Sequence, residues 1–96
     1  MPYFIYAEDK EGAVEVRKAN RDAHIAYIRE NYNDKMLAAG PILSDDGQTM
    51  IGSVILIDLP DRGAVDAFCK NDPYAKAGLF QRTTIRPFKH VFPQKG

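Results

Sequence analysis

The sequence lacks the features that mark a disulfide-linked, metal-binding or nucleotide-binding protein. It has one cysteine, Cys69, so no intramolecular disulfide can form, which fits a reducing compartment. Cys69 and the two histidines, His24 and His90, show no clustered spacing, and neither His-x-x-x-His nor Cys-x-x-Cys occurs. A glycine-rich phosphate loop and a dinucleotide fingerprint are also missing. We therefore expect no metal and no cofactor.

An excess of charge of one sign is missing as well. The 13 basic and 13 acidic residues cancel, and neither end of the chain carries a charged block. Electrostatics therefore favours neither nucleic acid nor an anionic membrane as a partner. No apolar stretch approaches the length needed to span a bilayer, and the N-terminal segment MPYFIYAEDK lacks the basic start and long apolar run of a signal peptide. These absences predict a cytoplasmic protein.

The residues that are present follow the pattern of a small α+β domain. Because 45% of the 96 residues are hydrophobic and 27% are charged, we expect a single domain over residues 1–96. Runs of β-branched and aromatic residues predict strands, and apolar residues at helical spacing predict helices. The expected elements are a strand at 3–7, a helix at 13–32, strands at 35–43 and 50–59, a helix at 60–71 capped by Asp61, a short helical turn at 72–80 and an extended run at 81–92. In the first helix, six positions fall near one inward stripe: Val16, Ala19, Ala23, Ala26, Tyr27 and Ile28.

This βαββαβ order predicts a ferredoxin-like antiparallel sheet with two helices on one face. The segment SVILI, residues 53–57, is apolar on both of its faces, so we expect the second sheet face to be covered. Sheet-on-sheet packing in a homodimer would cover it, and a monomeric mass by light scattering at micromolar concentration would contradict this. Pro87 cannot donate a ladder hydrogen bond, so the last strand is expected at an edge or with a bulge.

Glycine interrupts both strands of the expected hairpin. Gly40 and Pro41 stand in the first of them, where a simple bulge is the favoured explanation. Gly52 precedes Ser53 on the facing strand, and a glycine in a strong strand indicates a close approach of either backbone or ligand.

The first helix carries a group suited to proton transfer. Arg21 and His24 are three residues apart and share a helix face, with Arg17 one turn before Arg21. Histidine gives and takes a proton near neutral pH, and a guanidinium can hold an anionic ligand. A surface histidine beside solvated arginines fits the same pattern, so the residues alone leave both interpretations open.

Asp72 is the natural partner for this histidine. It precedes Pro73, and the pair fits the N-cap and first position of a short helix, which by itself accounts for both residues. The two roles can coexist if one carboxylate oxygen accepts a backbone N–H while the other reaches His24. Asp72 would then fix the ring tautomer and stabilise its cation. No nucleophile motif accompanies the pair.

Five segments together resemble the YCII-related (YciI-like) domain family over nearly the whole chain. They are RDAHIAYI, AGPIL, GQTMIGSVILID, FCKNDPYAKAGLF and TIRPFK. The resemblance implies a ferredoxin-like dimeric α/β barrel with a His–Asp pair in a pocket, which corresponds to His24 and Asp72. Other recurring positions of the family correspond to Arg21, Gly40, Pro41, Ser53, Pro73 and Tyr74.

Two hypotheses about function follow from this resemblance. Most members have no assigned reaction, but one relative is a dehydrochlorinase of a chlorinated hydroxyhydroquinone, and muconolactone isomerase shares the broader fold. The first hypothesis is a cofactor-free acid–base lyase or isomerase that acts on a small ring-containing or acidic metabolite. His24 would be its acid or base, Asp72 would orient His24, and Arg21 and Ser53 would hold substrate oxygens. The second is a non-catalytic dimeric module that binds a small molecule or supports another protein.

Overall fold

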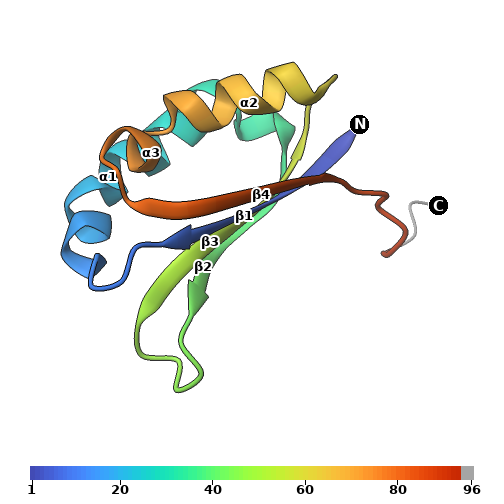
Figure 1. Ribbon diagram of the computed structural model, residues 1–96. Coiled ribbons are helices and arrows are strands. Elements are labelled where there is room, and N and C mark those ends of the chain that lie inside the picture. Colours follow the sequence, from blue (N-terminus) through green and yellow to red (C-terminus); the bar gives the residue numbers. More distant parts are fainter. Residues whose placement is uncertain (94–96) are drawn as a thin grey trace.

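The computed structural model describes residues 1–93 as one sheet with helices packed on it (Figure 1). The elements are β1 (Pro2–Asp9), α1 (Val14–Asn31), a 3-10 turn η1 (Asn33–Lys35), β2 (Met36–Leu43), β3 (Met50–Asp58), α2 (Arg62–Asn71), α3 (Pro73–Lys76) and β4 (Phe80–Pro87). Asp61 caps α2 as expected, because its side chain accepts the backbone N–H of Ala64 at 2.8 Å. The last strand is shorter than predicted and ends at Pro87. Within the described residues, no helix combines the length and hydropathy that crossing a membrane requires.

The sheet has the strand order β2-β3-β1-β4, and every neighbouring pair is antiparallel. All the helices lie on one face of it (Figure 1), so the ferredoxin-like fold is confirmed. β4 is an edge strand, which is where Pro87 is tolerated. The bulge expected at Gly40 and Pro41 is wrong: β2 pairs with β3 without a break from Ala38 to Ile42, and the register shifts lie outside that segment. Pro41 fits there because β2 is the other edge strand.

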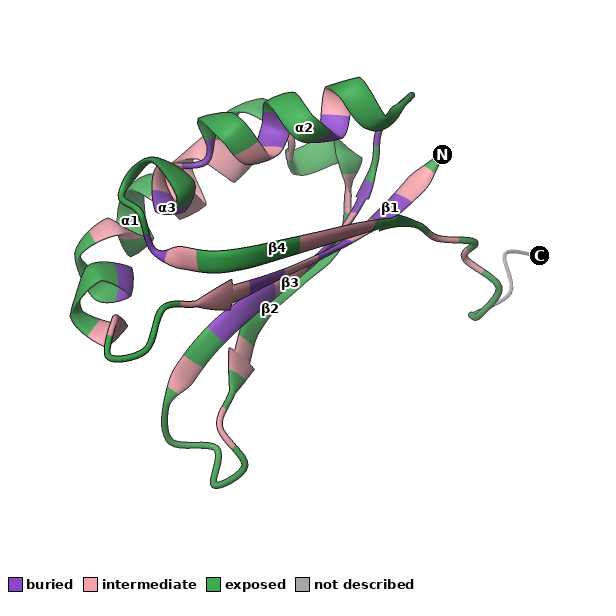
Figure 2. Ribbon diagram, viewed as in Figure 1, coloured by how far each residue is buried: buried purple, intermediate pink, exposed green. Residues whose placement is uncertain are grey.

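The hydrophobic core lies between the sheet and the helices. Alternate residues of β1 and β3 point toward the helices, among them Ile5, Ile55 and Ile57. Val65 and Phe68 of α2 pack against them, and all five residues are buried. Figure 2 shows buried segments, in purple, along β1, β3 and α2. The period of two in the strands therefore leaves the even positions on the opposite face.

The inward stripe of α1 agrees with the predicted one only toward its C-terminal end, where Tyr27 and Ile28 pack against the core. Val16, Ala19 and Ala23 are exposed, whereas Arg17 is the buried residue of the helix and His24 is half-buried. The prediction failed in the first half of the helix because it counted apolar residues only. Arg17 contacts Asp9 and Ser53 of the sheet and His24 contacts Asp72, so polar side chains occupy the inward side there.

The sheet face that points away from the helices carries apolar side chains in cross-strand pairs. Phe4 lies opposite Leu56 and Tyr6 opposite Val54, and all four are half-buried. Such pairs stabilise a sheet, and they also suit packing against a second sheet. The homodimer stays a prediction.

The close contact between β3 at Gly52 and the neighbouring strand β1 can be tested through protein stability. A Cβ atom at Gly52 would lie 2.6 Å from the carbonyl oxygen of Ala7, so the close approach is one of backbone. Gly52→Ala is expected to lower the free energy of unfolding by about 1–3 kcal/mol, measured by urea denaturation. The matched control is Gly40→Ala, where a Cβ meets no atom within 4 Å and the change should stay within about 0.5 kcal/mol. Equal stability of the two variants would contradict the approach.

Candidate functional site

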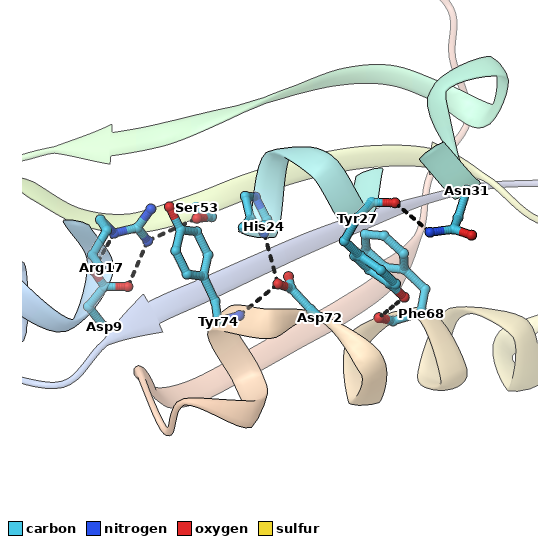
Figure 3. A network of polar contacts seen from close by, with 9 residues as sticks. All are labelled: Asp9, Arg17, His24, Tyr27, Asn31, Ser53, Phe68, Asp72 and Tyr74. Carbon is cyan, nitrogen blue, oxygen red and sulfur yellow. Dashed lines mark hydrogen bonds and ion pairs between the residues drawn. The ribbon is translucent and has the colours of Figure 1, made fainter. Parts of the chain in front are cut away.

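His24 and Asp72 meet between α1 and the junction of α2 and α3 (Figure 3). The distance from His24 Nδ1 to Asp72 Oδ1 is 2.8 Å. Asp72 is held in place because it ends α2 and caps α3, where its Oδ1 accepts the backbone N–H of Tyr74 at 2.9 Å. Pro73 occupies the first turn of α3, as the Asp-Pro pattern predicts. The Asp-Pro pair that starts α3 therefore also fixes the Asp72 carboxylate in the position where it faces His24.

The two oxygens of Asp72 do not share the helix cap and the contact with His24 in the expected way. We expected one oxygen to cap the helix and the other to reach His24. Oδ1 does both, since it accepts from Tyr74 and contacts His24 Nδ1. Among the described residues, none forms a hydrogen bond with Oδ2.

This contact decides which nitrogen of the neutral imidazole carries the proton. A carboxylate only accepts hydrogen bonds, so Nδ1 is the protonated nitrogen and Nε2 keeps its lone pair. No described residue bonds Nε2, and the described part of the chain contains no fully buried side-chain nitrogen or oxygen without a partner. Nε2 is therefore accessible and has the form of a general base.

Tyr74 is stacked between a cation and the imidazole. Its ring centroid is 4.0 Å from that of His24, with an interplanar angle of 16°, and 4.7 Å from Arg17 Cζ. Two groups at these distances cannot share one ring face, and Figure 3 shows Tyr74 between them. Burial raises the pKa of Tyr74 although Arg17 opposes the shift, so the ring is a neutral phenol. A neutral π face stabilises cations on both sides.

Arg17 is the residue that the sequence-based prediction missed. Its Nε and Nη2 donate to the two carboxylate oxygens of Asp9 at 2.7 and 2.8 Å, and Nη2 also donates to Ser53 Oγ at 2.9 Å. Burial lowers the pKa of Arg17, but the contact with Asp9 outweighs this, so the pKa is raised and the guanidinium stays charged. The spacing of seven residues from Arg17 to His24, which returns to the same helix face, is a signal that could have found it.

A cavity of about 420 Å³ lies beside this stack. Six of the predicted site residues border it: Arg21, His24, Gly40, Pro41, Ser53 and Tyr74. Asp72 does not border it, and Arg21 is an exposed residue at its rim. Ser53 is buried and accepts from Arg17, so its own hydroxyl proton is left to donate.

The charged side chains that border this cavity are arginines, of which Arg17 is paired with Asp9. Arg17, Arg21 and Arg29 border it, and no aspartate or glutamate of the described residues does. A concave site with charge of one sign concentrates ligands of the opposite sign. The cavity therefore suits a small molecule that carries an anionic oxygen, with the base His24 Nε2 beside it.

The model of the YCII-related domain matches residues 1–89. The chain belongs to the YCII-related domain family. This YCII-related chain is 33% identical over 98 residues to Protein YciI of Escherichia coli O6:H1, a match that covers 96% of the chain and 100% of its relative. It is 30% identical, with the same coverage, to an uncharacterized protein of Haemophilus influenzae.

Among solved structures, one that is similar to the YCII-related chain is an enzyme. It is similar to 5-chloro-2-hydroxyhydroquinone dehydrochlorinase (TftG) of Burkholderia phenoliruptrix AC1100 in complex with 2,5-dihydroxybenzoquinone. The TM-score is 0.86 at 36% identity, and the match covers 94% of this chain and 95% of that one. A putative antibiotic biosynthesis monooxygenase of Nitrosomonas europaea has a TM-score of 0.55 at 17% identity, covers 98% and 92% of the two chains, and shares the fold alone.

Proposed function

We propose that this YCII-related chain is a cofactor-free enzyme that eliminates from, or isomerises, a small hydroxylated ring compound by acid–base catalysis. One observation carries the proposal: the Nδ1 of His24 contacts Asp72 Oδ1 at 2.8 Å, so in the neutral ring Nε2 is the accessible basic nitrogen at a cavity bordered by three arginines. The likeness to a dehydrochlorinase at 36% identity supports a lyase-type reaction on such a ring.

In this proposal, His24 Nε2 takes a proton from an acidic O–H or C–H group of the substrate. The electron pair that stays behind moves into the ring system. In an elimination it expels chloride, which leaves with the electron pair of the carbon–chlorine bond, so that the net products are the dehydrochlorinated ring and HCl. In an isomerisation the same pair forms an enolate, which takes a proton back at another carbon. The protonated imidazole is stabilised by Asp72 and by the face of Tyr74.

The substrate oxygens have three partners in the cavity wall. Arg21 at the rim is free to meet an exposed anionic oxygen, while the guanidinium of Arg17, which is paired with Asp9, is fixed deeper in the wall. The Ser53 hydroxyl, whose lone pair is taken by Arg17, donates to a substrate oxygen. Charge that develops on oxygen during proton removal is thereby stabilised by groups that are already in place.

A screen of chlorinated and unchlorinated hydroxyquinols, lactones and related acids tests the proposal. We expect the wild-type protein to convert at least one ring compound, with chloride release measured by an ion-selective electrode and isomerisation by NMR. Recovery of a bound but unaltered compound from the whole panel would contradict catalysis and favour the binding module. The homodimer and the cytoplasmic location remain part of the proposal.

A further inference from the structure

A second, smaller cavity lies on another side of Asp72. Its volume is about 200 Å³, and its wall is built from β1, β3, β4, α2 and α3. Ala7, Ala75 and Thr83 border it and do not border the larger cavity. Most of the remaining wall is aliphatic or aromatic, and burial raises the pKa of the Cys69 thiol in it to about 11, so that thiol is neutral.

Asp72 supplies the buried polar group of this cavity, since the wall's Lys70 and Thr83 are exposed residues. Its side chain is 5% exposed, and it borders the small cavity but not the large one. Oδ1 is fully used by His24 and Tyr74, whereas no described residue bonds Oδ2. Because the described residues include no fully enclosed oxygen without a partner, the exposed remainder of the carboxylate opens into the small cavity. A buried acceptor in a mostly apolar space calls for a ligand that brings a donor.

We propose that this cavity is a second ligand site, which takes a neutral phenol-sized molecule whose hydroxyl donates to Oδ2 of Asp72. The size fits, because an apolar cavity of about 150 Å³ holds benzene. The charge fits as well: an anionic ligand would be repelled by the carboxylate, and Lys70, the other charged residue of the wall, is exposed to water. The two cavities thus select opposite forms of a hydroxylated ring, an anion beside His24 and a neutral molecule behind Asp72.

Occupancy of the small cavity changes the group that holds His24. A hydroxyl that donates to Oδ2 draws charge from the carboxylate, so Asp72 stabilises the His24 cation less. A phenol in the small cavity would then lower turnover without competing with substrate in the larger cavity. This consequence rests on the proposed function, whereas the binding of phenol to the small cavity does not.

Methyl NMR with phenol as the probe tests the site without any turnover assay. At millimolar phenol we expect the signals of Ala7 and Ala75 to shift in a saturable manner while that of Ala39, which borders only the larger cavity, stays in place. Toluene, which has the same shape but no donor, should bind about tenfold more weakly. In Asp72→Asn the preference for phenol over toluene should fall to less than about threefold, since a neutral amide then replaces the carboxylate acceptor.

Two matched substitutions separate the cavities. Ala75→Leu fills the small cavity and should abolish the phenol shifts, whereas Ala39→Leu fills the large one and should leave them unchanged. Thr83→Leu replaces Ala75→Leu if that variant gives the spectrum of an unfolded chain. Shifts at Ala39 instead of Ala7, equal affinity for toluene, or no shift at all would each overturn the second site. None of these results depends on whether the protein converts a ring compound in the screen. The proposed second site and the proposed enzyme activity can therefore each be refuted without the other.

Discussion

His24→Gln is expected to lower kcat for any compound that the wild-type protein converts by about 10²–10⁴-fold, the typical contribution of a positioned acid–base group. Glutamine keeps a polar side chain at the position but has no lone pair basic enough to take a proton. The matched control is His90→Gln, because His90 borders neither cavity and should retain full activity. Steady-state kinetics on the three proteins provides the measurement, with circular dichroism to verify folding.

Asp72→Asn separates the role of the carboxylate from that of the helix cap. Asparagine caps a helix about as well as aspartate, so α3 should persist. With its oxygen in the place of Oδ1, the amide still accepts from Tyr74 and from Nδ1, but it is neutral, so it no longer stabilises the His24 cation that forms when Nε2 takes a proton. We expect a loss of kcat of at least about 10²-fold with an unchanged fold. Full activity of either His24→Gln or Asp72→Asn would refute the proposed proton transfer.

The fold could be predicted because its signals are local. The period of two in β1 and β3, the turn between β2 and β3, and the caps at Asp61 and Asp72 each act over a few residues. Their order then leaves few topologies to consider. The end of the last strand was missed because 81–92 reads as extended, while pairing with β1 stops at Pro87. Cross-strand pairing is a tertiary property that no short segment encodes.

The candidate site was predictable only in part, for a related reason. His24 and Asp72 stood out because their residue types are suited to proton transfer, and the structure places them in contact. Arg17 did not stand out, because an arginine near a helix start is usually solvated. Its burial depends on Asp9 and Ser53, which come from two different strands. The emphasis on Arg21 over Arg17 followed from sequence proximity to His24, whereas the stack on Tyr74 is set by the tertiary fold.

Arg17→Met is expected to lower the free energy of unfolding by about 3–5 kcal/mol, because it leaves a buried carboxylate without its partner. The side chains of Arg17 and Asp9 are 2% and 5% exposed, so water cannot replace the lost hydrogen bonds. Arg21→Met is the matched control: Arg21 lies one turn further along α1 and is exposed, so its change should stay within about 0.5 kcal/mol. Urea denaturation of the variants provides the measurement.

The double variant Arg17→Met/Asp9→Leu decides what the ion pair does. Replacing both partners removes the unpaired charge, so we expect most of the lost stability to return. Activity should not return with it, because the double variant still lacks the cation that stacks on Tyr74 and holds the Ser53 hydroxyl. A double variant that is as unstable as Arg17→Met would contradict the unpaired charge as the cause. One that regains both stability and turnover would show that the buried cation has no part in the site.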